Sequence, residues 1–109
     1  MAKEKDFENR IKKYIDSVGG WQVKFFANAY TKTGIPDVLA CVNGHFIGIE
    51  VKAENGRISA LQTMQIKRIR AAGGIGIVVF PSGWEAFKRL IDDLKQDQFD
   101  LEKIPSVMK

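Results

Sequence analysis

The chain has 109 residues, of which 45% are hydrophobic and 28% charged, as in a single ordinary globular domain. It has no apolar run near the roughly 20 residues of a membrane-spanning helix, and its charged start, MAKEKDFENR, lacks the apolar stretch of a signal peptide. One cysteine and one histidine exclude an internal disulfide, a zinc cluster and a paired-histidine metal site, while the net charge of +4 suits a polyanionic partner. We therefore expect one cytoplasmic domain over residues 1–109, with no membrane partner.

The first half of the chain predicts a helix followed by three strands. Apolar residues at helical spacing indicate a helix over 3–18, which ends at a pair of glycines. Asn43 and Gly44 are a strong signal for a two-residue hairpin turn between two of the strands. A polar loop, NAYTKTGIP, precedes that hairpin. The three strands are predicted over 21–27, 37–42 and 45–53.

The second half predicts a helix, a strand and another helix. Ser59 and Gln62 have the spacing of a capping box at the start of a helix over 59–72. The segment 75–80 is almost continuously apolar, as in a strand that is covered on both faces. Ser82 and Glu85 predict a second capping box, at the start of a helix over 83–95. The tail, 96–109, is weakly patterned.

This order of elements predicts an α/β fold, in which a mixed sheet is flanked by helices over a core of about 5–95. The hairpin should be antiparallel, and the later strand–helix–strand crossover should be parallel and right-handed.

Three residues near the hairpin carry the strongest chemical signal. A two-residue turn pairs Val42 with His45, and counting outward places Asp37 directly opposite Glu50, with Cβ atoms about 5 Å apart on one sheet face. Lys52 lies two residues further along and projects from the same face. Like charges in opposite positions are destabilising, and a divalent cation such as Mg²⁺ resolves the conflict.

These residues predict metal-assisted hydrolysis of a phosphodiester. A metal-bound water is activated for attack, and Lys52 would orient that water or stabilise the developing charge on the phosphate. The alternative is that one of the acids simply forms an ordinary strand salt bridge with Lys52. Spacing alone leaves both interpretations open.

Two motifs resemble a known nuclease superfamily. Residues 34–37, GIPD, and 49–52, IEVK, resemble the PD-(D/E)XK motif of the restriction-endonuclease-like superfamily. Further features resemble the VRR-Nuc family of virus-type replication-repair nucleases, and the likeness covers roughly residues 5–90. These features are Trp21, Gly56 with Ser59 and Gln62, and RAAGG before an apolar strand. The resemblance implies a restriction-endonuclease-like α-β-β-β-α-β core and dependence on Mg²⁺ or Mn²⁺.

The resemblance also implies roles for individual residues. Asp37, Glu50 and the backbone carbonyl of Val51 would hold the metal, with Glu8 of the first helix completing the site. Lys52 would assist the attacking water, and Gln62 would be a further polar residue of the catalytic site. Glu8 is otherwise a solvated surface acid, and Gln62 is otherwise only a helix cap.

Several residues are candidates for contact with DNA. Lys32 and Arg57 lie in predicted loops that flank the site and suit phosphate contacts, and Lys24 is a further basic candidate. Tyr30, in the polar loop, is a candidate for stacking on an unpaired base, although an exposed loop tyrosine often has no such role. Helix 59–72 also carries basic residues near its end, where cations favour the helix dipole without any DNA.

The leading prediction is a metal-dependent DNA endonuclease in a bacterial or phage-infected cell. Short family members act as homodimers on branched DNA such as Holliday junctions, so the resemblance implies the same here. Apolar residues of the tail would supply dimer contacts or pack on their own domain; these are Phe99, Leu101, Ile104 and Val107. The alternatives are a non-catalytic nucleic-acid-binding module with the same fold, and a protein-interaction domain.

Overall fold

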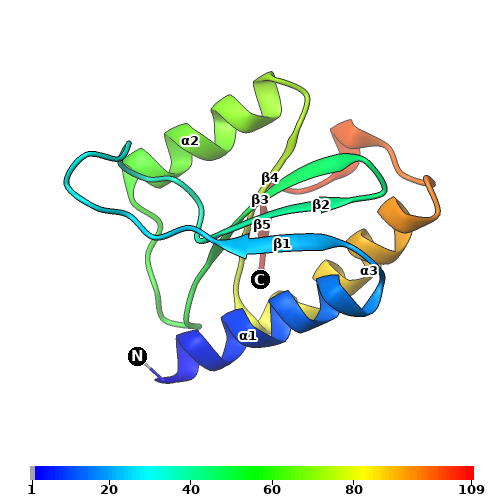
Figure 1. Ribbon diagram of the computed structural model, residues 1–109, viewed down its shortest axis with the longest axis horizontal. Coiled ribbons are helices and arrows are strands. Elements are labelled where there is room, and N and C mark those ends of the chain that lie inside the picture. The colour runs from blue at the N-terminus through cyan, green and yellow to red at the C-terminus, as the bar shows by residue number, and fades with distance from the viewer. Residues whose placement is uncertain (1) are drawn as a thin grey trace.

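In the computed structural model, which describes residues 2–109, the chain forms a five-stranded sheet with three α-helices packed on it (Figure 1). The strand order is β1-β2-β3-β4-β5, and β2 runs antiparallel to β1 and β3, whereas β3, β4 and β5 are parallel to one another. The strands are β1 (Trp21–Lys24), β2 (Val38–Val42), β3 (His45–Val51), β4 (Ile75–Val79) and β5 (Val107–Met108). The predicted α/β fold with a mixed sheet is confirmed.

The helices lie on opposite faces of the sheet (Figure 1). The first helix, α1 (Ala2–Ser17), buries the predicted stripe of Phe7, Ile11 and Ile15 against one face, together with α3 (Trp84–Lys95). The other face carries α2 (Ala60–Ala71), which packs over β3 and β4. No helix within residues 2–109 is long and apolar enough to cross a membrane.

The hairpin between β2 and β3 has the predicted register. Val42 pairs with His45, and the last regular pair at the other end is Val38 with Ile49. Asn43 and Gly44 have φ angles of 51° and 79°, which is the left-handed backbone that a two-residue hairpin turn requires. The next positions outward from Val38 and Ile49 belong to the two predicted acids.

Two paired glycines let α2 approach the sheet closely. Gly48 of β3 and Gly76 of β4 are neighbours in the parallel register, and both lie under α2. A Cβ atom on Gly48 would lie 2.6 Å from the side chain of Ile69, and one on Gly76 would lie 2.7 Å from the Ile66 carbonyl oxygen. This close packing brings the first turn of α2 within reach of the acids at the end of β3.

The two predicted capping boxes have different outcomes. The box of Ser59 and Gln62 is confirmed at the start of α2, with both reciprocal hydrogen bonds present. The box of Ser82 and Glu85 is wrong, because Ser82 lies in a short 3₁₀ turn (Pro81–Gly83) and α3 begins after it, at Trp84, without a side-chain cap. Both the amide and the hydroxyl of Ser82 donate to the carboxylate of Glu54, at 2.9 and 2.8 Å.

The tail is more ordered than its weak pattern predicts. A 3₁₀ turn (Leu101–Lys103) leads to β5, which pairs with β4 at the edge of the sheet. Phe99 and Leu101 pack against the core and Ile104 is buried, whereas Val107 is exposed. Arg70 of α2 donates to the carbonyl oxygens of Gly76 and Ile104 and so ties the tail to the sheet.

Candidate active site

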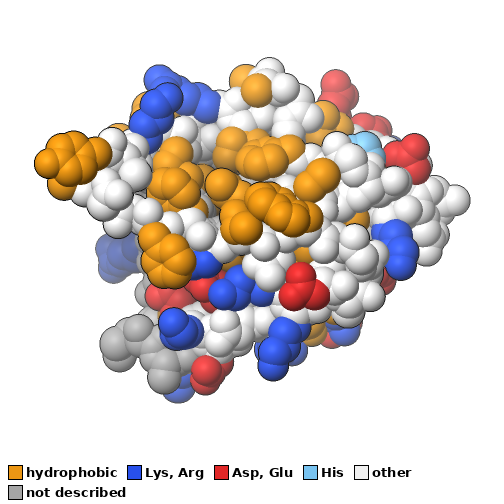
Figure 2. All heavy atoms as spheres, in the orientation of Figure 1, with side chains coloured by type: hydrophobic (Ala, Val, Ile, Leu, Met, Phe, Trp, Pro, Cys, Tyr) orange, Lys and Arg blue, Asp and Glu red, His pale blue; other side chains and the backbone are white. Residues whose placement is uncertain are grey.

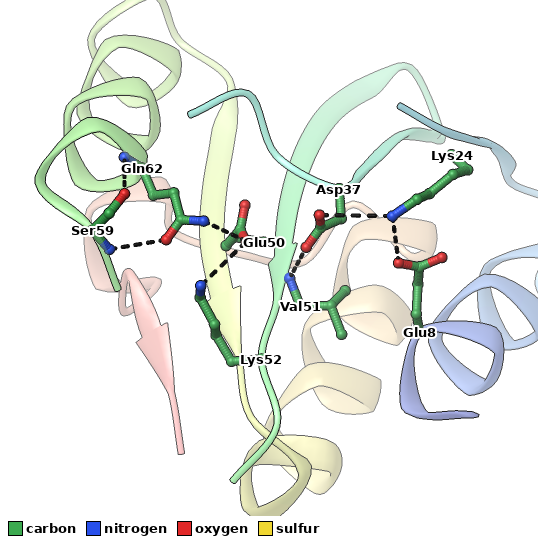
Figure 3. A network of polar contacts seen from close by, with 8 residues as sticks. All are labelled: Glu8, Lys24, Asp37, Glu50, Val51, Lys52, Ser59 and Gln62. Atoms are coloured by element: carbon green, nitrogen blue, oxygen red, sulfur yellow. Dashed lines mark hydrogen bonds and ion pairs between the residues drawn. The ribbon is translucent and has the colours of Figure 1, made fainter. Parts of the chain in front are cut away.

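Asp37 and Glu50 meet where the β2–β3 hairpin opens (Figure 3). The register places the two residues opposite each other, one step beyond the last regular pair. The Asp37 Oδ2 atom accepts a hydrogen bond of 2.9 Å from the backbone amide of Val51. This bond anchors the aspartate side chain at the end of β3, beside the glutamate that precedes Val51 in the chain.

Glu50 is a buried acid in an unfavourable electrostatic setting. Its side chain comes from a strand that is covered by α2, and only 3% of the residue is exposed. Burial, and after it the neighbouring Asp37 carboxylate, raise the pKa of Glu50 to about 8 against the opposing positive charge of Lys52. The site therefore lacks the positive charge that would stabilise two ionised acids.

Lys52 and Gln62 both contact the same oxygen of Glu50. The Lys52 ammonium lies 3.7 Å from Glu50 Oε2, as expected for residues two apart on one face of a strand. The Gln62 Nε2 atom donates to the same oxygen at 3.0 Å. The structure thus brings Asp37, Glu50, Lys52 and Gln62 together.

The capping box of α2 fixes the orientation of the Gln62 amide. Gln62 Oε1 accepts from the Ser59 amide at 2.9 Å, while its backbone amide donates to Ser59 Oγ at 3.1 Å (Figure 3). Because the oxygen of the side-chain amide faces Ser59, its nitrogen faces Glu50. Gln62 is therefore a helix cap and a contact of the buried acid at the same time.

Glu8 and Lys24 extend the cluster beyond Asp37. Glu8 is 7% exposed, so it faces the sheet and is not the solvated surface acid of the alternative interpretation. The Lys24 ammonium donates to Glu8 Oε1 at 2.8 Å and lies 3.7 Å from Asp37 Oδ1. Lys24, a candidate for DNA contact, thus lies between two of the predicted metal ligands, and the sequence contains no local signal for this ion pair.

The backbone of Val51 lies on the same side as Asp37. In a strand, the amide and carbonyl of one residue point toward the same neighbouring strand. The Val51 amide donates to Asp37, whereas the next amide, of Lys52, donates to Val79 of β4 on the opposite side. The Val51 carbonyl therefore points toward the Asp37 side, as its predicted role requires.

The acids and the Val51 carbonyl fit a hydrated Mg²⁺ or Mn²⁺. Within residues 2–109 there is no group of three or more His, Cys, Asp or Glu residues placed to hold a metal ion. Mg²⁺, however, is often bound through one or two carboxylates and keeps several waters. The raised pKa of Glu50 beside Asp37 indicates the kind of unbalanced negative charge that a divalent cation neutralises.

The remaining DNA candidates lie on the surface. Tyr30 is 98% exposed, and Lys32 and Arg57 are exposed as well. The loop of Tyr30 has some internal order, because the Tyr30 amide donates to the Asn28 side chain at 2.8 Å and buried Gln65 of α2 donates to the Thr33 carbonyl at 3.3 Å. These three residues are free to contact a ligand, but nothing in their geometry identifies one.

An exposed apolar face adjoins the site. Trp21 of β1 and Phe46 of β3 flank Cys41 of β2 in one row across the sheet, and Val23 flanks Leu39 in the next row. Trp21 is 57% exposed, and Val23 and Phe46 are exposed too. Figure 2 shows apolar side chains gathered between α2 and the β1 edge. In the register of the strands, the third row on this face is Asp37 and Glu50.

Comparisons with known proteins add no relatives. No protein-family model matches the chain, and no curated protein is significantly similar to it.

Proposed function

We propose that this protein is a metal-dependent endonuclease that hydrolyses phosphodiester bonds of DNA. The observation that carries the proposal is the burial of Glu50 directly beside Asp37. The pKa of Glu50 is raised to about 8, and the Lys52 ammonium lies 3.7 Å from Glu50 Oε2. Folding alone gives no benefit from such a pair, since burial beside Asp37 disfavours the ionised form of Glu50. Binding of a cation that acts on phosphate would explain why Asp37 and Glu50 lie together.

Each residue then has a chemical role. Asp37, Glu50 and the Val51 carbonyl would hold Mg²⁺ or Mn²⁺, which supplies charge neutralisation and an acidified water. Lys52 orients the attacking water and stabilises the charge that develops on the phosphate, because its ammonium lies beside Glu50. Gln62 keeps the Glu50 carboxylate in one orientation through the bond of 3.0 Å.

DNA is the substrate class that the charge favours. The net charge is +4, and exposed Lys32 and Arg57 are available for phosphates while Tyr30 is available for an unpaired base. We propose selectivity for branched DNA, such as a Holliday junction, and action as a homodimer that presents one site to each of two strands. The apolar face of Trp21, Val23 and Phe46 offers a surface for that dimer.

The test is a cleavage assay on labelled duplex, flap and four-way-junction DNA with Mg²⁺, Mn²⁺ or EDTA. Wild-type protein should cut with metal and not with EDTA, and Lys52→Ala should not cut. Lys13→Ala is a matched control, because Lys13 is exposed on α1 away from the acids, and it should cut like wild type. If Lys52→Ala cuts as fast as wild type, the proposed site is wrong.

The alternative function is a nucleic-acid-binding module that does not cut. It is favoured by one observation: within residues 2–109, fewer than three potential ligand side chains converge at any point. This alternative predicts salt-sensitive binding of DNA that persists in EDTA, with no cleavage in Mg²⁺. A binding assay in EDTA and a cleavage assay in Mg²⁺ therefore separate it from the nuclease.

A further inference from the structure

Lys24 projects from the end of β1 into the acidic cluster (Figure 3). Its register partner is Val38, whose side chain is in the core on the α1 side of the sheet. The ammonium therefore reaches Glu8 of α1 at 2.8 Å and comes within 3.7 Å of Asp37 Oδ1. It also lies 6.0 Å from the centre of the Phe26 ring.

The two acids around Lys24 differ in how firmly they hold it. The bond to Glu8 is short, and Glu8 is almost fully buried, so this carboxylate is a firm partner. The distance to Asp37 is that of a loose ion pair. The second oxygen of Asp37 is fixed independently by the Val51 amide. Lys24 can therefore leave Asp37 and remain bound to Glu8, without disturbing the position of the aspartate.

We propose that Lys24 is a built-in counter-ion of the metal-free site that competes with the divalent cation for Asp37. This inference rests on the proposed function, since it assumes a cation at Asp37 and Glu50. A cation bound by Asp37 would lie a few ångströms from the ammonium, and two positive charges at that range repel each other strongly in a half-buried setting. Lys24 thereby weakens metal binding, and Glu8 acts by holding Lys24 in place.

The opposite role would leave a different signature. If Lys24 only positioned Asp37 for the metal, its removal would weaken metal binding. If it is a competitor, its removal strengthens metal binding while it destabilises the metal-free protein, because Glu8 then lies buried without its closest cationic partner. The direction of the change in metal affinity therefore separates the two roles.

The experiment is a calorimetric titration of the full chain with Mn²⁺ alone, in the absence of DNA. Lys24→Met keeps the aliphatic stem and removes the charge, and it should bind Mn²⁺ about tenfold more tightly than wild type. Lys24→Arg keeps the charge and should bind like wild type. Lys12→Met is the matched control: Lys12 also pairs with Glu8, at 3.5 Å, and no contact joins it to Asp37, so its removal should leave affinity unchanged within twofold.

The outcomes separate the inference from the proposed function. Equal or weaker binding by Lys24→Met, beside clear binding by wild type, overturns the competitor role and leaves the nuclease intact. Tighter binding by Lys12→Met to the same degree also overturns it, since the effect would then be one of general charge. No Mn²⁺ binding by any of the four proteins overturns both the inference and the metal site beneath it.

Discussion

The polar residues at the two ends of the β2–β3 hairpin differ in the partners that surround them. At the turn, Asn43 donates to the carbonyl oxygen of Leu94 at 3.1 Å, and His45 meets the carboxylate of Asp97 at 3.1 Å. Each group there finds a complementary partner on a neighbouring segment. At the open end, Asp37 and Glu50 face each other, and the more buried of the two has the strongly raised pKa.

The difference shows which end is arranged for folding alone. The partners at the turn hold the hairpin against α3 and the segment after it. At the open end the ionised form of buried Glu50 is disfavoured, and the surrounding lysines only partly offset this. A conflict of this kind persists in a stable protein when the residues serve a function.

The largest expected effect is on catalysis at the open end. If the proposed function holds, Asp37→Asn removes one of the two carboxylates that would hold the cation and should lower the cleavage rate by about a thousandfold or more, with the fold intact by circular dichroism. The matched change at the turn, Asp97→Asn, should leave the rate within twofold of wild type. Retained cleavage by purified Asp37→Asn protein would refute the proposed site.

The second-largest expected effect is on the free energy of unfolding of Glu50→Gln, and its dependence on pH has a defined sign. Below about pH 4.5 Glu50 is protonated in both the folded and unfolded states; between pH 4.5 and 8 it ionises first in the unfolded state, which lowers the free energy of unfolding. Glu50→Gln removes this loss. We expect it to stabilise the metal-free protein by roughly 2–4 kcal/mol above pH 8, with a smaller gain at pH 5.

Urea unfolding at several pH values, with EDTA present, measures that gain. Glu102→Gln is the control, because Glu102 is exposed and its substitution should change stability little at any pH. A Glu50→Gln protein whose advantage over wild type does not grow between pH 5 and 8 would contradict the burial argument.

Added metal should reverse the order of stability between the wild-type protein and the Asp37→Asn variant. Under the proposed function, Mg²⁺ or Mn²⁺ should bind only the folded protein and raise the melting temperature of wild type by a few degrees at a concentration well above the dissociation constant. Asp37→Asn should show no such rise, although it should melt higher than wild type in EDTA. A thermal melt of wild type that does not respond to either metal would count against the site.

The smallest expected effect is at the turn. The pair of His45 and Asp97 is exposed on the Asp97 side, and exposed ion pairs contribute little. Asp97→Asn, which tolerates the left-handed backbone at this position (φ 57°), should therefore change the free energy of unfolding by less than about 1 kcal/mol, measured by urea unfolding at pH 6. A loss of several kcal/mol would show that the turn, too, depends on buried charge.

Local patterns predicted much of the fold and the centre of the site. Asn43 and Gly44 set the hairpin register, and simple counting from them placed Asp37 opposite Glu50, as the structure confirms. The apolar stripe of α1 and the capping box at Ser59 were also readable, because each depends on residues a few positions apart.

Features that depend on distant segments were not predictable in this way. Ser82 has the spacing of a helix cap, but the Glu54 carboxylate approaches from another loop. It accepts hydrogen bonds from both the amide and the hydroxyl of Ser82. The strand β5 has only two residues, too few for any periodicity, and its pairing with β4 depends on tertiary packing. The ion pairs of Lys24 likewise require α1 and β1 to be packed together.

The glycine pair beneath α2, Gly48 and Gly76, sets the distance between the helix and the sheet. That distance in turn sets the position of Gln62 relative to Glu50 in the candidate active site. Because Gln62 sits in the first turn of α2, a methyl group on Gly76, which would meet the Ile66 backbone at 2.7 Å, would push the helix outward and carry the amide away from Glu50. Gly76→Ala is thus a way to loosen the orientation of the buried acid without touching any charged residue, whereas a methyl group on Gly48 would meet the end of the Ile69 side chain, which can move aside. Gly76→Ala should therefore lower the proposed nuclease activity although Gly76 does not contact either acid.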